Sequence, residues 1–206
     1  MPGDFVAPSD PLAVITDVDE LSDEEAAALQ DCFTIGDTRT FEQDPELGLV
    51  VLAEIASRAL SPAVNDPGTT IDVIGTATRL LAHWQDSDEE GAGHVPFHRV
   101  HVPPLLPAKL FDDAFRPIAR DGAALVEVGI ALQKAFLHLA TNPDEAFRKE
   151  AREHSQAALS RAQRALLHEP DYLQLKRLAD AMANLATHRS GLDSAQGRRA
   201  SALRFK

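Results

Sequence analysis

The chain has 206 residues, of which 44% are hydrophobic and 25% are charged, and these values exclude an intrinsically disordered protein as the default interpretation. This length suits one medium-sized domain with appendages that needs no metal or disulfide to complete its core. The net charge of −12 argues against nucleic acid as the main partner, because binding to phosphates depends on Lys and Arg.

The first 17 residues predict a small β-hairpin. Phe5 and Val6 precede a turn-forming stretch at residues 8–11, and the apolar run at residues 12–15 follows it. An isolated two-stranded hairpin is only marginally stable in water. We therefore expect residues 1–17 to form a domain of their own that belongs to a larger β unit, of which this chain holds only a part.

Residues 18–189 predict a helical domain, so the expected fold class is mainly α, a bundle of about six to seven helices with the N-terminal hairpin. Ser22 and Glu25 form a capping box that opens a helix ending near Phe33. Four further helices are expected where a capping residue precedes proline, at Asp44-Pro45, Asp66-Pro67, Asn142-Pro143 and Glu169-Pro170. Two more are expected over residues 110–118 and 121–141.

Three segments depart from the helical pattern. Residues 86–98 are acidic and contain glycine, which predicts a loop, and residues 99–102 predict a short strand before two prolines. Residues 190–206 are polar and basic with too little apolar content to pack, which predicts a disordered tail as the third domain. Docking of this tail on anionic lipid or on the acidic face of a neighbouring molecule is the alternative.

Two stretches, RTFEQDPELG at residues 39–48 and RALSPAVNDPGTT at residues 58–70, share one layout, a polar loop that leads into an Asp-Pro helix start. They contain the patterns R-T-x-x-Q-D and ALSP-x-x-NDP-x-T. Together with PGDFVAPSDPLAVI upstream, they resemble a family of uncharacterised bacterial predicted membrane proteins, a domain of unknown function. The resemblance covers most of the first 85 residues.

The resemblance implies a location as well as a family. Its members carry several transmembrane helices before a soluble portion, so the resemblance implies that this chain is the soluble C-terminal portion. The parent protein is then expected in the bacterial inner membrane, with the soluble part in the cytoplasm and with membrane contact only through segments absent from this chain. The resemblance brings no activity, cofactor or catalytic residue.

Seven polar residues in the two loops form a candidate ligand site or structural cluster. The helix that begins at Pro67 offers its first amides beside glycine and two threonines, which suits a bound anion. Asp66 would fill that place as the N-cap, and Arg39 would pair with Asp44 or Asp66, so a structural clamp is the interpretation we favour. The seven residues are Arg39, Gln43, Asp44, Arg58, Asn65, Asp66 and Thr69.

Other chemistry has little support in the sequence. His94, His98 and His101 lie within eight residues, but they fall across a loop without cysteine, so we expect no metal site. The chain has no nucleophile elbow, P-loop, dinucleotide fingerprint or C-x-x-C motif. We therefore expect no cofactor and no recognised catalytic machinery, although enzymatic activity stays undecided.

These patterns predict a soluble, non-enzymatic assembly or regulatory domain of a bacterial membrane protein. It is expected to form homo-oligomers and to bind no nucleic acid. The alternative is an enzyme or a ligand or anion sensor whose site is formed by residues 39–44 and 58–70 and whose small-molecule ligand is unknown.

Overall fold

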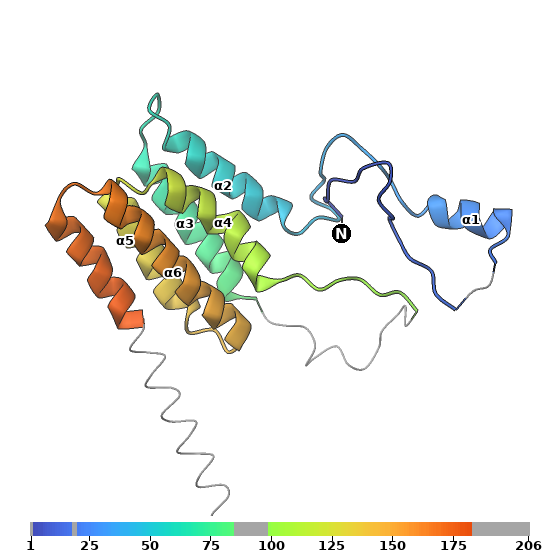
Figure 1. Ribbon diagram of the computed structural model, residues 1–206. Helices are drawn as coiled ribbons and strands as arrows, with labels where there is room; N and C mark the ends of the chain where they lie inside the picture. The colour runs from blue at the N-terminus through green and yellow to red at the C-terminus, as the bar shows by residue number, and fades with distance from the viewer. Residues whose placement is uncertain (1, 18–19, 85–98, 183–206) are drawn as a thin grey trace, which may run out of the picture. The chain divides into compact units, whose positions relative to one another are not determined.

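The computed structural model describes residues 2–17, 20–84 and 99–182 (Figure 1). The predicted loop at residues 86–98, with His94 and His98, and the predicted tail at residues 190–206 lie outside this described part. Contacts divide the chain into two compact units, Met1–Leu47 and Gly48–Lys206. Each unit is described separately below.

The first unit contains one helix, α1 (Asp23–Gln30). The predicted capping box is confirmed, because the Ser22 hydroxyl accepts from the Glu25 amide and the Glu25 carboxylate accepts from the Ser22 amide at 2.9 Å. The Ser22 hydroxyl also lowers the pKa of Glu25. No residue of α1 is buried, so its start is fixed by local capping rather than by packing.

The predicted N-terminal β-hairpin is wrong, because residues 2–17 contain no strand. Two local hydrogen bonds close a turn instead: the Asp10 amide donates to the Ala7 carbonyl at 2.9 Å, and the Ala7 amide donates to the Asp10 carboxylate at 2.8 Å. Pro8 and Pro11 have no N–H to donate to a strand ladder. Phe5 is 94% exposed, so no apolar face stabilises a sheet.

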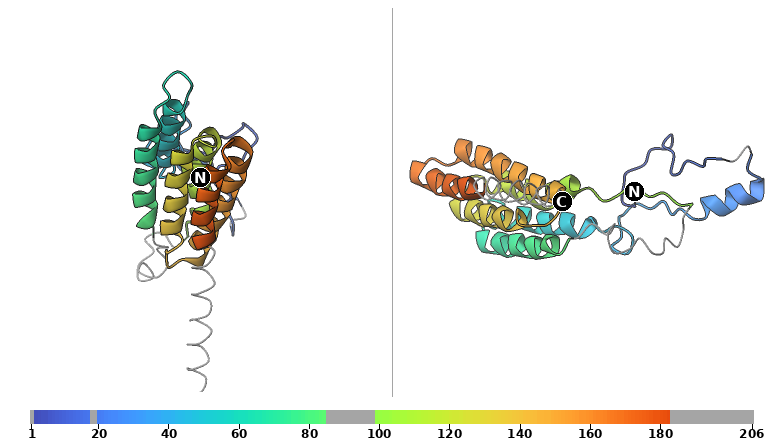
Figure 2. Two further views of the ribbon diagram at one scale, coloured as in Figure 1. Left: turned by 90° about the vertical axis from the view of Figure 1, so that its left-hand side faces the viewer. Right: turned by 90° about the horizontal axis from the view of Figure 1, so that it is seen from below.

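The second unit is a bundle of helices that lie side by side along a common direction (Figures 1 and 2). Helix α5 packs against α3 and α6, and α4 packs against α6. With α1, the described residues form seven helices, so the mainly α fold is confirmed. The helices of this unit are α2 (Leu47–Ala59), α3 (Pro67–Ala82), α4 (Pro107–Asp121), α5 (Val126–Leu139), α6 (Glu145–Ala165) and a helical segment over residues 169–182.

One of the predicted helix starts, that of α3, lies where it was predicted, and another, that of α6, lies further along the chain. Helix α3 begins at Pro67 with Asp66 as its N-cap, as predicted. Helix α6 begins two residues later than expected, because Asp144 is the N-cap and the Asn142 side chain accepts from the Asp144 amide at 2.8 Å. The amide and proline of the Asn142-Pro143 pair therefore form the turn before the helix rather than its first residues.

Helix α4 is longer than the predicted segment over residues 110–118. Its first residue is Pro107, where the missing N–H costs no helical hydrogen bond. It also continues past Pro117, which lacks an N–H inside the helix. The buried face of α4, which includes Phe111, Phe115 and Ile118, explains why packing maintains the helix there. Because α4 ends at Asp121, α5 starts at Val126 rather than at the predicted residue 121.

Four phenylalanines form the centre of the core. The ring of Phe111 lies 4.9 Å from that of Phe147 and 5.7 Å from that of Phe115, and Phe115 meets Phe136 at 5.1 Å. All four side chains are fully buried. Aromatic pairs at these separations add to the free energy gained from burial, so they fix α4 against α5 and α6.

The predicted strand over residues 99–102 is also wrong, because this segment adopts no regular structure. Val100 and Val102 are each 62% exposed, so no partner element covers them within the described residues. Without a neighbouring strand, the β-branched side chains alone do not produce a ladder.

Candidate functional site

The first polar loop forms an ion pair between Arg39 and Asp44. The Arg39 guanidinium donates from Nε to Asp44 Oδ2 and from Nη2 to Asp44 Oδ1, the latter at 2.8 Å, so the contact is bidentate. Glu46 lies 3.9 Å from the same guanidinium. Asp44 and Glu46 are buried, whereas the Arg39 side chain is 31% exposed.

The same carboxylate also organises the start of α2. Asp44 Oδ1 accepts hydrogen bonds from the backbone amides of Glu46 and Leu47, both at 3.2 Å. The Arg39 guanidinium is the largest cause that lowers the pKa of Asp44, and these two amides add to the effect against the cost of burial. The predicted helix start at Asp44-Pro45 is two residues too early, because α2 begins at Leu47 and the Asp44 carboxylate organises the turn before the helix.

Gly3 completes this arrangement within the first unit. Its φ is +87°, a conformation that side chains disfavour. A Cβ atom at this position would collide with the Asp44 carboxylate and with Nε of Arg39. The close approach of the backbone at Gly3 therefore depends on the absence of a side chain. Sequence reasoning missed this contact, because Gly3 and Asp44 are 41 positions apart in the chain.

The second polar loop ends in Asp66, the N-cap of α3, whose carboxylate and backbone amide are both hydrogen-bonded. Asp66 accepts from the Thr69 amide at 3.1 Å and from the Thr69 hydroxyl at 2.6 Å, and the hydroxyl is the largest cause that lowers the pKa of Asp66. The Asp66 amide in turn donates to the Ala59 carbonyl at 2.8 Å. The Asp66 carboxylate thus takes the place beside the amides of α3 that an anion would need.

Asn65 has a local reason to be present that the sequence did not reveal. Its φ is +49°, in the left-handed region that Asn tolerates better than most residues. Its amide donates to the Ser61 carbonyl at 2.9 Å, which closes the loop between α2 and α3. A left-handed turn at this point brings Asp66 to the N-terminus of α3, where it is the N-cap.

We expect Asn65→Val to destabilise the second unit by about 1–2 kcal/mol, because a β-branched residue is strained at positive φ. Asn65→Gly, the matched control, should change the free energy of unfolding little, because glycine adopts this conformation without strain. Urea denaturation of both variants measures the difference. Equal stability of the Val and Gly variants would contradict a conformational role for Asn65.

The structure brings the predicted residues together in pairs. Arg39 contacts Asp44, and Asp66 contacts Thr69, while the side chain of Gln43 is exposed. The two loops belong to different units, so a single cluster of all seven residues stays a prediction. Within each loop, the contacts are those of a cap or a clamp.

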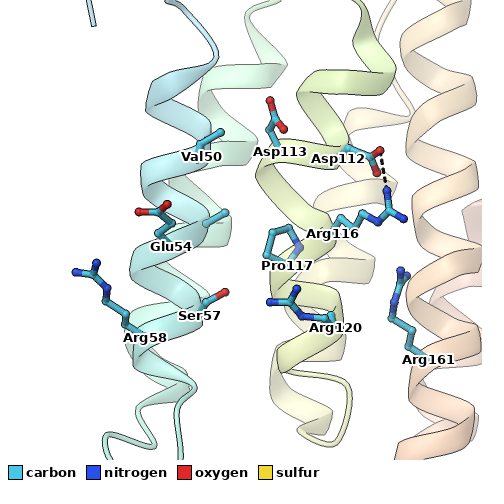
Figure 3. A pocket seen from close by; sticks show the side chains of 11 residues that line it. Val50, Glu54, Ser57, Arg58, Asp112, Asp113, Arg116, Pro117, Arg120 and Arg161 are labelled. Carbon is cyan, nitrogen blue, oxygen red and sulfur yellow. Dashed lines mark hydrogen bonds and ion pairs between the residues drawn. The ribbon is translucent and has the colours of Figure 1, made fainter. Parts of the chain in front are cut away.

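Arg58, the remaining predicted residue, lines a groove that lies wholly within the second unit (Figure 3). The groove has a volume of about 930 Å³ and is bordered by α2, α4 and α6. Val50 and Ser57 on α2 face Pro117 and Arg120 on α4, and Arg161 projects from α6 (Figure 3). Four arginines in all contribute to its lining, and the sequence had singled out only Arg58.

The charges in this groove are only partly paired. Arg116 donates to Asp112 at 3.1 Å, and Arg120 donates to the neighbouring Asp121 at 2.6 and 2.9 Å. The Arg120 guanidinium is the largest cause that lowers the pKa of Asp121. The Ser57 hydroxyl adds a smaller lowering, yet its buried Oγ has no hydrogen bond of regular geometry in the described part of the chain.

A histidine and an aspartate meet beside the groove, in a smaller hollow of about 200 Å³. His154 Nε2 lies 3.2 Å from Asp112 Oδ1, and its Nδ1 lies 3.1 Å from the Glu150 carbonyl oxygen. The imidazole also packs on Phe111 at a centroid distance of 5.4 Å. These contacts hold the ring between α4 and α6, and no serine, threonine or cysteine hydroxyl or thiol is bonded to it among the described residues.

The described residues hold no group of three or more His, Cys, Asp or Glu placed to bind a metal ion. His101 is exposed, and its two predicted neighbours at residues 94 and 98 lie outside the described part. Cys32 is exposed too, and its thiol donates to the Ala28 carbonyl at 3.4 Å.

Comparison with known proteins identifies one family. Residues 1–138 match the family described as "Predicted membrane protein (DUF2254)", which is more than half of the chain. No solved structure matches the chain significantly. None of the helices in residues 2–17, 20–84 and 99–182 combines the length and the apolar content that crossing a membrane requires.

Individual relatives come from mycobacteria. The chain is 55% identical over 40 residues to the uncharacterized protein Rv1290c of Mycobacterium tuberculosis and to the uncharacterized protein Mb1321c of Mycobacterium bovis. The matched segment covers 19% of this chain and 8% of each relative. The chain therefore corresponds to a small part of these proteins, whose names state no activity.

Proposed function

The chain belongs to this family of predicted membrane proteins, and from that membership we propose that it acts as a non-enzymatic assembly or regulatory domain of a membrane protein. The observation that carries the proposal is that the polar residues of the two loops bond to one another and to helix starts. Arg39 and Asp44 form a bidentate ion pair, and Asp66 caps α3 through Thr69. Side chains committed to such contacts position helices and are not available for a substrate.

Self-association is the partner interaction that we propose. The Thr70 hydroxyl donates to the Ala56 carbonyl at 3.3 Å, so α2 and α3 are adjacent at this level. Ile55, which precedes Ala56, and Ile71, which follows Thr70, are 43% and 36% exposed. Contact between copies would bury these side chains and so favour association. We further propose that the parent protein lies in the bacterial inner membrane, with this domain on the cytoplasmic side and no role in nucleic acid binding.

The alternative is an enzyme or a ligand sensor whose site is formed by residues 39–44 and 58–70. It has less support, because the Asp66 carboxylate fills the N-terminus of α3 and Arg39 is paired with Asp44. Arg58 is the one predicted site residue that lines an open groove, and that groove is bordered by helices rather than by the two loops.

Sedimentation of the purified chain over a range of concentrations tests the assembly proposal. We expect the wild-type chain to self-associate and Ile55→Glu with Ile71→Glu to be monomeric, because burying two carboxylates in an apolar contact is costly. Leu167→Glu, at a fully exposed position, is the matched control and should associate like wild type. The proposal would be ruled out if the wild-type chain were strictly monomeric and the whole membrane protein that contains it were monomeric too.

A further inference from the structure

The groove described above gathers four arginines in a chain whose net charge is −12. Its four arginines come from three helices: Arg58 from α2, Arg116 and Arg120 from α4, and Arg161 from α6 (Figure 3). Three carboxylates, those of Glu54, Asp112 and Asp113, share the lining, and a fourth, that of Asp121, pairs with Arg120. The folded arrangement therefore gathers arginines from three separate helices around one groove, although acidic groups balance their number.

Part of the donor capacity in the groove is unused. Arg116 and Arg120 are paired with Asp112 and Asp121, but Arg58 and Arg161 form no ion pair or hydrogen bond with any described residue. Ser57 adds a buried hydroxyl without a hydrogen bond of regular geometry. A buried hydroxyl in this state is costly unless something accepts from it or donates to it. Among the described residues, two unpaired guanidiniums therefore border the same groove, together with the Ser57 hydroxyl, which lies near the Asp121 carboxylate without a hydrogen bond of regular geometry.

We propose that this groove binds a small polyanion that carries two or more phosphate groups. Guanidinium groups bind phosphate oxygens through paired, charge-assisted hydrogen bonds, and a serine hydroxyl adds a further donor. The volume of about 930 Å³ falls in the range of small-molecule sites. The proposal does not depend on the assembly role proposed above, because the groove belongs to a single copy of the second unit.

The guanidiniums come from different helices, which favours a ligand with more than one phosphate group. Arg58 and Arg161 project from α2 and α6, and α4 with its Arg120 lies between these two helices (Figure 3). The phosphate groups of pyrophosphate or tripolyphosphate can each accept from a different guanidinium, whereas one orthophosphate offers fewer oxygens to share among them.

Calorimetric titration of the whole chain with orthophosphate, pyrophosphate and tripolyphosphate tests the proposal. Tripolyphosphate should bind with one-to-one stoichiometry, and orthophosphate should bind at least about tenfold more weakly, because fewer charge-assisted hydrogen bonds form. Affinity should fall as salt rises, since salt screens exposed charges. If neither pyrophosphate nor tripolyphosphate binds, and vesicles do not bind either, the proposal is wrong.

Three variants and one control assign the binding to the groove. Arg58→Gln, Arg161→Gln and Ser57→Ala should each weaken tripolyphosphate binding, the arginine changes by about tenfold or more. Arg164→Gln changes an exposed arginine on α6 outside the groove and should bind like wild type. Ser57→Ala should also keep the wild-type melting temperature, because it removes a hydroxyl that lacks a regular hydrogen bond. An equal loss in Arg164→Gln would mean nonspecific attraction and overturn the assignment.

A second arm distinguishes a free phosphate compound from a lipid headgroup. Flotation with vesicles of phosphatidylcholine, with and without phosphatidylglycerol, shows whether the chain binds anionic lipid. Binding that is lost in Arg58→Gln and Arg161→Gln but kept in Arg164→Gln would retain the phosphate site and assign it to lipid. Binding to vesicles that is insensitive to all three changes, without binding of free polyphosphate, would contradict the proposal.

Discussion

Replacing Phe111 by alanine is expected to destabilise the second unit by about 3–5 kcal/mol, the usual range for removing a large aromatic side chain from a core. The Phe111 side chain is fully buried and contacts Phe115, Phe136 and Phe147. Its loss leaves a cavity where α4, α5 and α6 meet. Urea denaturation followed by far-ultraviolet circular dichroism measures the change.

An exposed leucine in the same unit provides the control. Leu167 is fully exposed, between α6 and the helical segment at residues 169–182, so Leu167→Ala should change the free energy of unfolding by less than about 0.5 kcal/mol. A Phe111→Ala variant as stable as Leu167→Ala would show that the four phenylalanines do not form the stabilising centre of this bundle.

Local capping chemistry made the helix starts the most predictable part of the fold. The Ser22 and Glu25 capping box and the Asp66-Pro67 start depend on side chains within three residues of the helix they open. The same reasoning placed α6 too early, because Asn142 and Asp144 both bond to nearby amides. Two capping residues that lie two positions apart leave the first residue of a helix undecided until the chain is folded.

Strands could not be predicted in the same way. Residues 2–17 and 99–102 carry the apolar and β-branched side chains that strands favour, yet neither segment forms one. A strand requires a partner that accepts its backbone hydrogen bonds, and sequence pattern alone does not supply that partner. In the N-terminal stretch, Pro8, Asp10 and Pro11 instead favour a local turn.

In the candidate site, too, contacts between residues close in sequence could be predicted, and contacts between distant residues could not. Asp44 was one of the two partners predicted for Arg39, and the two residues are only five positions apart in the chain. The groove joins Ser57 to Arg161, which are 104 residues apart, so no spacing rule could find it. The buried pair of Gln133 and Ser155, in which Gln133 donates to the Ser155 carbonyl at 3.0 Å, likewise emerges only from packing.

The two Asp-Pro loops therefore share a layout but differ in what their polar residues do. The Asp66 carboxylate forms only local bonds, to Thr69 three residues later, and Asp66 is exposed. Asp44 is buried and joins an arginine to the two amides that begin α2. The first loop is consequently the one in which a single substitution leaves a buried charge without its partner.

Arg39→Ala should lower the local stability of the first loop by about 3 kcal/mol, the low end for breaking a buried ion pair, because Arg39 itself is 31% exposed. Hydrogen exchange at the amides of Glu46 and Leu47, which donate to Asp44, measures the effect directly. Their protection should fall roughly a hundredfold, as 1.4 kcal/mol corresponds to a factor of ten. Glu42→Ala, at an exposed position of the same loop, is the control and should leave the protection unchanged.

The pH dependence of this loop follows from the lowered pKa of Asp44. Because the folded pKa lies below the unfolded value, the ion pair contributes fully above the ordinary aspartate pKa and is lost as pH falls through the folded pKa. Arg39→Ala removes the largest cause of the lowering, so the pKa of Asp44 should rise. A carbon-13 titration of the Asp44 carboxyl group measures its pKa in the folded wild-type chain and in the Arg39→Ala variant. An unchanged pKa with unchanged amide protection would mean that Arg39 does not hold this carboxylate, and the clamp would lose its basis.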